Sequence, residues 1–475
     1  MSQSTLPPVS APVTEVPSGR AAPASEEETP ARRREGETLL PFCFLKVRKG
    51  TGYHMLNPVD NREYVVDYAE YRILEQCDGT RTPEEIAGSV EAALGMTKAA
   101  AAGYTAAFLD KMRRAGIVAF RRSPVRYEPG CPPPFVVYWD VTAACNLRCS
   151  HCYCPGCEPC RNELSTEVVR RTLEEMSAFG VKWVVFSGGE PLLRKDFLEI
   201  AAHARGLRFE YLSVATNGTL IDRDTARRLK ALDLDVQVSI DGDNAETHDL
   251  MRGVKGAFDQ AIRGLKLLQE EGMDVSVCTV AARSNVDRIP NILQLMRDLG
   301  VQHYRVQAVM PMGRGRTNSK DLRLSPARLK ELVQYLDGRN ISASSYEFTL
   351  KPPPKQAVDY CQNGACAAAT SKCAITAEGN VVPCTPFWGM NGENVRDHTF
   401  PWIWERSPLL NYFRSITLND IRGVCRDCKW LMLCNGGCKV DNYVDGDLFG
   451  SNGDCWIAHE MRLAAASSKE GSGEF

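Results

Sequence analysis

Residues 135–154, FVVYWDVTAACNLRCSHCYC, join a strand-like apolar run to a dense group of cysteines. Residues 135–142 are rich in β-branched and aromatic side chains, which predicts a buried strand. Cys145, Cys149 and Cys152 follow with the spacing C-x3-C-x2-C. Three thiolates at this spacing can hold three irons of a four-iron cluster and leave the fourth iron open. A structural zinc site normally needs four ligands, often in two C-x2-C pairs, which this stretch lacks.

Five more strand-like runs follow, and helical stretches such as 165–180 and 256–272 lie between them. The runs are KWVVFSGG (182–189), YLSVATNG (211–218), DVQVSIDG (235–242), DVSVCTV (274–280) and HYRVQAV (303–309). This alternation predicts an α/β fold over residues 135–345, in which a parallel β/α unit repeats six times as a partial (β/α)6 barrel of the TIM type. Working residues are then expected at the carboxyl ends of the strands.

Four motifs occur in order behind the three cysteines. They are SGGEP (187–191), ATNGT (215–219), VSIDG (238–242) and HDLMRG (248–253). In this order they resemble the radical S-adenosylmethionine (SAM) superfamily. In such enzymes a reduced four-iron cluster passes an electron to SAM, and the resulting 5'-deoxyadenosyl radical abstracts a hydrogen atom from the substrate.

The resemblance implies a set of SAM-binding residues at the strand ends: Tyr153, Gly188, Gly189, Glu190, Asn217, Ser239 and Arg252. The glycine-rich turn would meet the amino group of SAM, because glycines let backbone approach a ligand and Glu190 can complement an ammonium. Ser239 would approach the ribose or the carboxylate, and Asn217 would line the same cavity. Arg252 is a further candidate for the carboxylate.

A second dense group of cysteines lies in residues 355–462. Its last part has the spacing C-x2-C-x5-C-x3-C followed by a distant cysteine, with the residues Cys425, Cys428, Cys434, Cys438 and Cys455. This pattern closely resembles the SPASM extension of peptide-modifying radical SAM enzymes. A structural zinc ribbon is the alternative, but nine cysteines are too many for two tetrahedral zinc sites.

The SPASM resemblance implies two auxiliary four-iron clusters, and therefore three such clusters in the whole chain. The outer auxiliary cluster would be held by Cys425, Cys428, Cys434 and Cys455. The inner one would be held by Cys384 and Cys438 together with two of Cys361, Cys366 and Cys373. Cys366 and Cys373 are favoured because their spacing to Cys384 fits the common form of the extension.

Residues 41–122 form a third region, in which alternating strand patterns precede three helical stretches. Thr82 and Glu85 have the spacing of a capping box, with Pro83 in the first helical turn. The segments 54–67, 70–87 and 108–118 resemble the pyrroloquinoline-quinone peptide chaperones, also called RiPP recognition elements, in which a leader peptide adds a strand to a sheet edge. The region is therefore predicted to be a winged-helix-like, peptide-binding α+β domain. A DNA-binding or dimerising winged helix is the alternative.

The composition indicates what the remaining segments are and where in the cell the protein is expected. The formal net charge is −2, which gives no indication of a nucleic-acid partner. No apolar run is as long as a membrane span, which needs about 18 residues. Residues 1–40 have no apolar segment of a signal peptide and are predicted to be a disordered leader of a cytoplasmic protein. Residues 123–134 are predicted to be a linker and residues 463–475 a flexible tail.

The other cysteines fall into two classes. Structural disulfides are rare in the cytoplasm, so nineteen thiols indicate metal binding or catalysis. Cys43, Cys77 and Cys278 stand alone among apolar neighbours and are interpreted as small buried hydrophobes. No role is assigned to four cysteines beside the dense groups: Cys131, Cys154, Cys157 and Cys160.

Three functions agree with these patterns. The first is a maturase that crosslinks a ribosomally made precursor peptide, for example through a thioether or carbon–carbon bond, after residues 41–122 bind its leader. The second is an enzyme of haem or tetrapyrrole synthesis, and the third is an iron–sulfur electron carrier. Sulfatase maturation is disfavoured, because Thr385 stands at the position where sulfatase-maturing enzymes have an aspartate that acts as the base. The resemblance implies an electron donor such as flavodoxin or ferredoxin, and no catalytic acid or base is identified.

Overall fold

The computed structural model describes the chain in twelve segments. They are residues 38–41, 45–49, 52–56, 63–77, 81–114, 118–121, 131–154, 162–337, 342–343, 347–349, 366–434 and 436–470. The chain forms two compact units, residues 1–125 and residues 126–475. No helix in the described segments is both long and apolar enough to cross a membrane.

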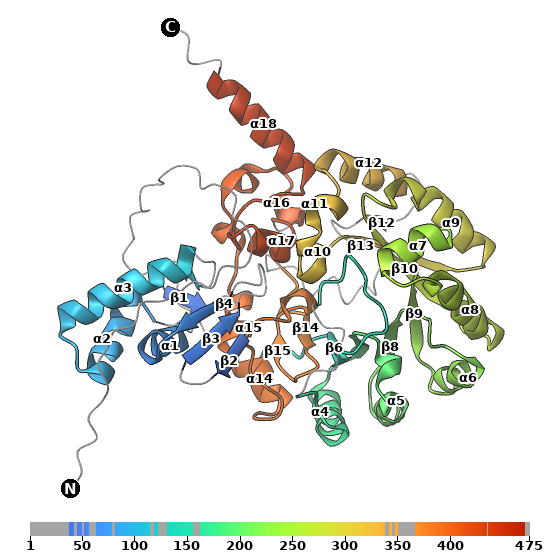
Figure 1. Cartoon of the computed structure of the whole chain (residues 1–475), viewed down its shortest axis with the longest axis horizontal. Helices are drawn as coiled ribbons and strands as arrows, with labels where there is room; N and C mark the ends of the chain where they lie inside the picture. Colours follow the sequence, from blue (N-terminus) through green and yellow to red (C-terminus); the bar gives the residue numbers. More distant parts are fainter. Residues whose placement is uncertain are drawn as a thin grey trace. The chain divides into compact units, whose positions relative to one another are not determined.

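The second unit is built on six parallel strands that are neighbours in chain order (Figure 1). They are β6 (Val136–Thr142), β7 (Trp183–Gly188), β8 (Tyr211–Thr216), β9 (Asp235–Ser239), β10 (Ser276–Ala281) and β11 (His303–Ala308). All six coincide with the predicted runs, so the partial barrel is confirmed. The antiparallel pair β12 (Ser342–Ala343) and β13 (Glu347–Thr349) extends the sheet beyond β11. The barrel is therefore open.

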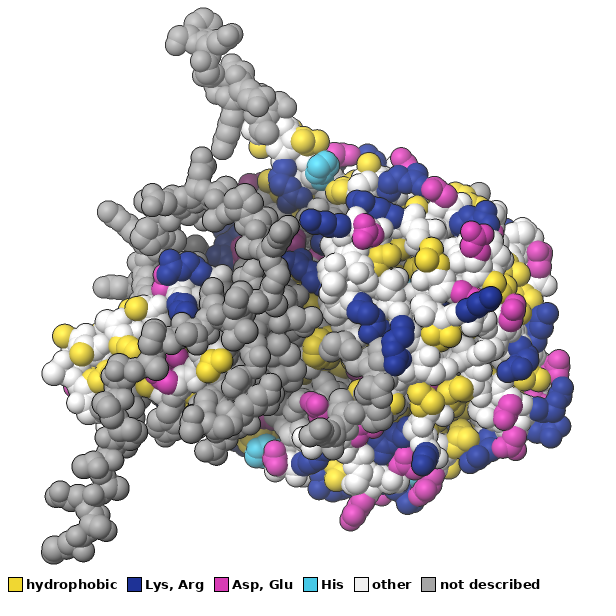
Figure 2. Space-filling view, in the orientation of Figure 1, with side chains coloured by type: hydrophobic (Ala, Val, Ile, Leu, Met, Phe, Trp, Pro, Cys, Tyr) yellow, Lys and Arg dark blue, Asp and Glu magenta, His cyan; other side chains and the backbone are white. Residues whose placement is uncertain are grey.

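Helices between the strands cover the outer face of the sheet (Figure 1). They include α4 (Thr166–Phe179), α5 (Phe197–Arg205), α6 (Arg223–Ala231), α8 (Ala257–Glu270) and α9 (Ile289–Asp298). Helix α7 (Ala245–Arg252) instead packs on the cysteine loop. Helix α4 illustrates the pattern, since Val169, Leu173 and Met176 are buried on one face of the helix. Ser165 caps its first turn, and Gly180 ends it in the left-handed conformation. Lys, Arg, Asp and Glu side chains are mixed over the outer surface in view (Figure 2).

The cysteine-rich segment continues the barrel sheet. Strand β14 (Lys372–Ile375) pairs in parallel with β6, with Cys373 opposite Val137, and forms a hairpin with β15 (Val381–Val382). The following helices include α14 (Phe400–Arg406), α15 (Pro408–Arg414), α17 (Lys439–Val444) and α18 (Trp456–Glu470). Trp404 of α14 donates from Nε1 to the carbonyl of Pro132 at 2.9 Å. The extension thus packs on the start of the barrel.

The end of the chain departs from the prediction. Residues 463–470 were expected in a flexible tail, but they belong to α18. Their sequence, LAAASSKE, is rich in residues of high helix propensity, which explains why the helix continues past the cysteine-rich region.

The first unit contains an antiparallel meander of β2 (Leu45–Lys49), β3 (Gly52–Leu56) and β4 (Glu63–Val66). Helices α1 (Tyr68–Glu75), α2 (Pro83–Leu94) and α3 (Lys98–Arg114) follow it. The predicted capping box is present, since Thr82 N donates to Glu85 Oε2 and Glu85 N donates to Thr82 Oγ1. The core of the unit includes Ile73, Ile86 and Leu109, and Cys77 is buried among them as predicted.

Two strands of the first unit were not predicted. Strand β1 (Thr38–Pro41) pairs antiparallel with β5 (Val118–Arg121), so Thr38–Leu40 are not part of a disordered leader. The partner of β1 lies far along the chain, and runs of only four residues are too short to show a local strand pattern. The rest of the predicted leader, residues 1–37, Cys43, and residues 122–130 of the linker region lie outside the described residues.

Candidate active site

A cavity of about 600 Å³ opens at the carboxyl ends of the barrel strands and extends through the barrel interior. The three cysteines of the first motif, Cys145, Cys149 and Cys152, line its wall. They pack together with Leu147 and Ala257 in one small cluster. Burial raises the pKa of Cys145 to about 11, the neighbouring thiols add to this rise, and the Leu147 N–H opposes it. A shared iron group would favour the thiolates, so the donor set fits a cluster held by three cysteines.

Residues from distant parts of the chain fix the loop that carries these cysteines. Arg314 Nε donates to the carbonyl of Cys149 at 2.7 Å, and Asn318 Nδ2 donates to that of Ser150 at 2.9 Å. Arg314 belongs to α10 (Gly313–Thr317), which follows β11. Trp388 Nε1 donates to the carbonyl of Tyr153 at 2.8 Å. None of these three residues was predicted from the sequence, because their contacts depend on the tertiary fold.

The glycine-rich turn packs against the same loop. Gly188 and Gly189 line the cavity, as predicted. A Cβ atom on Gly189 would lie 2.0 Å from the carbonyl oxygen of Ala144, and one on Gly188 would lie 2.2 Å from that of Thr142. The glycines are therefore required for close backbone packing between the turn and the cysteine loop, which the sequence interpretation did not include.

Glu190 lies behind this turn and does not line the cavity in the described structure. Its fully buried carboxylate accepts hydrogen bonds from Thr216 Oγ1 and Asn217 N, each at 2.7 Å, and from Leu192 N at 3.2 Å. Burial raises the pKa of Glu190, and the bonds from Asn217 and Thr216 oppose that change. The carboxylate thus ties the turn to the end of β8, and this geometry gives no support to the direct contact with SAM that was predicted.

Asn217, Ser239 and Tyr153 also line the cavity. Asn217 Nδ2 donates to Asn146 Oδ1 at 2.8 Å, and Asn146 Nδ2 donates to Thr219 Oγ1 at 2.8 Å. Asn146 follows Cys145 directly, so this chain of bonds joins the cysteine loop to the end of β8. Asn146 and Thr219 stand inside the quoted motifs CNLRC and ATNGT, and only the structure shows that they meet.

Arg252 also lines the cavity, but its guanidinium is paired with an acidic residue, Asp241. Its Nε lies 2.7 Å from Asp241 Oδ2, and its Nη1 lies 3.7 Å from Cys149 Sγ. Asp241 lies in addition 3.4 Å from His151 Nε2. Asp241 is fully buried, and burial tends to raise its pKa, but Arg252 and His151 lower it below its ordinary value. Arg252 therefore connects the fourth strand end to the cysteine loop.

The first barrel strand carries a second buried acid. Asp140 of β6 is almost completely buried, its Oδ1 has no hydrogen-bond partner among the described atoms, and its side chain bonds to Ser187. Burial raises the pKa of Asp140 to about 7, and the bond to Ser187 partly opposes the rise. Burial also raises the pKa of Tyr153 well above its ordinary value, and Asp140 adds to that effect. Asp140 was not among the residues that the sequence motifs indicated.

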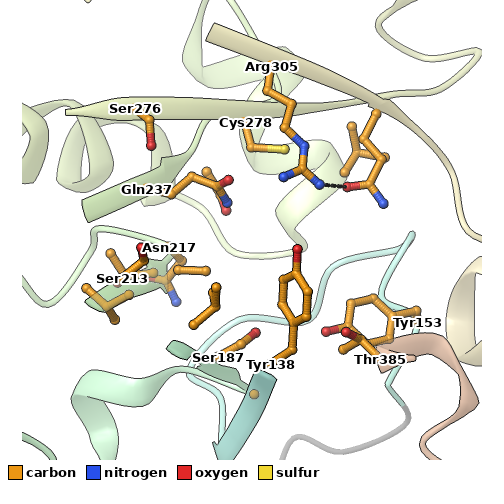
Figure 3. Close-up of a pocket in the computed structure, with 18 of the residues that line it drawn as sticks. Tyr138, Tyr153, Ser187, Ser213, Asn217, Gln237, Ser276, Cys278, Arg305 and Thr385 are labelled. Atoms are coloured by element: carbon orange, nitrogen blue, oxygen red, sulfur yellow. Dashed lines mark hydrogen bonds between the residues drawn. The ribbon is translucent and has the colours of Figure 1, made fainter. Parts of the chain in front are cut away.

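The deeper part of the cavity is lined by polar side chains from several strands (Figure 3). Tyr138 of β6 points inward, and Arg305 of β11 and Cys278 of β10 point toward it from the opposite wall. Arg305 Nη2 donates to Gln307 Oε1 at 3.4 Å. Cys278 is buried, as predicted, but it faces the cavity and is not packed only among apolar side chains.

The cysteines proposed for the inner cluster influence one another electrostatically. Burial raises the pKa values of Cys373 and Cys438, and the thiol of Cys384 adds to both effects. Cys366 also adds to the rise in the pKa of Cys438. Cys384 lines the barrel cavity as well, beside Thr385. The inner group therefore reaches the site where SAM and substrate are expected.

The cysteines proposed for the outer cluster are Cys425, Cys428, Cys434 and Cys455. The pKa of Cys455 is raised by burial and then by the thiols of Cys425 and Cys434, while Cys428 N donates to the carbonyl of Cys425 at 3.2 Å. Four thiols in each group match the donor set of a four-iron cluster. No three His, Cys, Asp or Glu side chains in the described segments converge on the position of a single metal ion.

The five remaining cysteines add little to this picture. Cys361, the alternative inner ligand, and Cys157 and Cys160 lie outside the described residues. Cys131 is half-buried, and Cys154 lines the cavity beside the first motif.

Three family models match the chain. Residues 139–296 match the radical SAM superfamily, and residues 366–429 match the SPASM iron–sulfur cluster-binding domain. Residues 52–118 match coenzyme PQQ synthesis protein D. These matches confirm the three resemblances that the sequence motifs indicated.

Curated relatives with different activities cover most of the chain. An AdoMet-dependent heme synthase of Nitratidesulfovibrio vulgaris is 31% identical over 348 residues, which are 68% of this chain and 92% of that protein. The mycofactocin maturase MftC of Mycolicibacterium smegmatis is 32% identical over 347 residues, which are 70% of this chain and 84% of that protein. Sequence similarity alone therefore does not separate a tetrapyrrole substrate from a peptide substrate.

Among solved structures, SuiB of Streptococcus suis bound to its precursor peptide SuiA has a similar fold. The match has a TM-score of 0.55 and 17% identity, and it covers 88% of this chain and 99% of that chain. The match covers a larger share of this chain than residues 126–475 make up. The similarity therefore extends into the first unit.

Proposed function

The chain belongs to the radical SAM superfamily and carries a SPASM extension, and from this premise we propose that it modifies a ribosomally made precursor peptide bound through its leader. It is an enzyme that uses SAM and four-iron clusters. The modification that we propose is a crosslink, either a thioether or a carbon–carbon bond. Forming either bond removes two hydrogen atoms from the peptide in total.

The observation that carries this proposal is the first unit. It matches coenzyme PQQ synthesis protein D over residues 52–118, and its three-stranded meander has β2 and β4 as its edges. An edge strand presents unpaired backbone N–H and C=O groups, with which an extended peptide can pair. An enzyme that acts on a small molecule needs no such module.

The cavity supplies the chemistry in this proposal. Cys145, Cys149 and Cys152 would hold the cluster that binds SAM, and the bound pair supplies a 5'-deoxyadenosyl radical. Tyr153, Gly188, Gly189, Asn217 and Ser239 would orient SAM, and Glu190 and Arg252 would hold the surrounding loops. The polar wall near Tyr138 and Arg305 would receive the peptide segment to be modified.

A tetrapyrrole substrate is the second candidate, because the heme synthase of Nitratidesulfovibrio vulgaris covers most of this chain. That relative matches 68% of the chain, which is a smaller share than residues 126–475 make up. The mycofactocin maturase matches 70% of the chain, which is also a smaller share, so neither match requires the first unit, whereas the peptide proposal does.

The test compares the full chain with a variant that lacks residues 1–125, both prepared without oxygen. Fluorescently labelled peptides encoded beside the gene are titrated in a polarisation assay, and products are measured by mass spectrometry. We expect micromolar or tighter binding by the full chain alone, and a product that has lost two hydrogens. SAM cleavage by both proteins shows that the shorter one is folded. Absence of peptide binding, together with turnover of an iron-porphyrin precursor, would establish the second candidate instead.

A further inference from the structure

The inward face of the barrel sheet is polar, whereas the outward face is apolar. Side chains alternate between the two faces of a strand, so every second residue of β9, β10 and β11 points into the cavity. The inward residues are Asp235, Gln237 and Ser239 of β9, Ser276, Cys278 and Val280 of β10, and His303, Arg305 and Gln307 of β11. On the outward face, Val236, Val277 and Val306 are buried. The interior of a TIM-type barrel is usually filled by Val, Ile and Leu, so a polar interior around a cavity indicates a polar ligand.

Two hydrogen-bond donors face each other in the middle of this interior. Arg305 is the third residue of β11, and Tyr138 is the third residue of β6, the strand at the other end of the parallel series. The register places Arg305 beside Cys278 of β10. Figure 3 shows the Tyr138 hydroxyl and the Arg305 guanidinium directed toward each other from opposite walls of the cavity. A ligand between these walls would contact both side chains.

The guanidinium of Arg305 has the chemistry of a carboxylate receptor. It is permanently charged, and it offers five N–H donors in one plane and no acceptor. One donor, on Nη2, is directed at the neutral Gln307 Oε1 at 3.4 Å. With five donors, the group can bond to the protein and to a ligand at the same time. Two parallel N–H groups match the two oxygens of a carboxylate.

The negative charges of the cavity lie at another height in the barrel. Among the described lining residues, the acids are Asp235 and Asp274. Asp235 is the first residue of β9 and Asp274 precedes β10, so both stand at the amino ends of the strands. Asp274 Oδ2 also lies 3.1 Å from His303 Nε2. The middle of the interior, with a cation and a phenol hydroxyl, therefore suits an anion.

We propose that Arg305 and Tyr138 bind a carboxylate of the substrate and thereby select the peptide residue that enters the barrel. The carboxylate belongs either to an Asp or Glu side chain of the peptide or to its C-terminus, since both present the same two oxygens. This inference rests on the proposed function for the substrate being a peptide. The subsite itself is formed by the barrel alone, so it can be tested without the peptide.

The experiment measures the binding of small probes to the full chain by saturation-transfer NMR. The protein is prepared without oxygen, saturated with SAM and given no reductant, so that SAM occupies its own site and is not cleaved. N-acetylglutamate methylamide and N-acetylglutamine methylamide represent the side chain, and N-acetylalanine and its amide represent the C-terminus. We expect at least one of the two acids to bind about tenfold more tightly than its amide, and Arg305→Met to remove this difference.

Two further variants accompany Arg305→Met. Arg297→Met is the matched control, because Arg297 is exposed on α9, the helix before β11. It removes the same charge outside the cavity and should keep the preference for the acid. Tyr138→Phe preserves the shape of the ring and should weaken binding of the acid about fivefold, through the loss of one hydrogen bond.

Other outcomes would overturn the proposal. They are equal binding of acids and amides by the parent protein, and a preference for the acid that persists in Arg305→Met. If the parent binds no probe and Arg305→Met raises the Kd for SAM about tenfold, Arg305 serves the carboxylate of SAM and the substrate subsite is excluded. If Arg305→Met does not fold, Tyr138→Phe decides, and unchanged binding of the acid by this variant would refute the subsite. Failure of the proposed function is seen separately, as absence of peptide binding by the full chain.

Discussion

Replacing Glu190 by alanine tests whether this carboxylate holds the glycine-rich turn or contacts SAM directly. In the structure it accepts hydrogen bonds from Thr216 Oγ1 and Asn217 N at 2.7 Å, and a longer one from Leu192 N. All of these bonds join Glu190 to other residues of the protein itself. The variant should therefore be less stable even when no ligand is added.

The magnitude follows from the two short bonds. A hydrogen bond to a charged group contributes about 1.5 to 3 kcal/mol, so the pair contributes about 3 to 6 kcal/mol. Burial of the carboxylate, which raises the pKa of Glu190, offsets part of this. We therefore expect a loss near the lower limit, about 3 kcal/mol, and a fall in Tm of roughly 3 to 6 °C. Displacement of Gly188 and Gly189 should also weaken SAM binding.

The assay measures Tm without SAM and the Kd for SAM, both under anaerobic conditions. Glu199→Ala is the matched control, because its carboxylate is exposed and pairs with Arg170 only on the surface, at 3.2 Å. The control should change Tm by less than about 1 °C, since such pairs contribute about 0 to 1 kcal/mol. An unchanged Tm in Glu190→Ala, together with a large loss of SAM affinity, would refute the reasoning and establish the direct contact.

Three further predictions concern the same region. Gly189→Ala should abolish formation of 5'-deoxyadenosine while the extension keeps its iron, because the added Cβ would lie 2.0 Å from the Ala144 carbonyl; normal turnover would contradict this packing. Asp140→Asn should become more stable relative to the parent as pH rises from about 4 to 7, by up to about 1.4 kcal/mol per pH unit, and the gain should level off above pH 7. The reason is that the native carboxyl of Asp140, with a pKa of about 7, keeps a proton that the unfolded chain has released. A difference in Tm between the variant and the parent that does not change with pH would show that burial does not raise the pKa of Asp140. Trp388→Phe should raise the Kd for SAM about fivefold, since it removes the bond of about 1 kcal/mol to the Tyr153 carbonyl, and an unchanged Kd would show that this bond does not position the loop.

The sequence by itself determined the order of the parts and the chemistry that they carry. Strand alternation has a period of two and ligand spacing is a local property, so six barrel strands and the cysteine motifs could be recognised without a structure. The same holds for the capping box of Thr82 and Glu85, because both residues lie within one helical turn. The match to family models followed from these local patterns.

The tertiary structure decided what each polar side chain contacts. Glu190 and Arg252 stand in the expected motifs, yet burial and partners from other strands give them supporting contacts that no spacing predicts. Cys278 faces the cavity because of the direction of β10, and β1 is a strand only because a distant segment pairs with it. These contacts join residues far apart in the chain, which only the packing of the fold brings together.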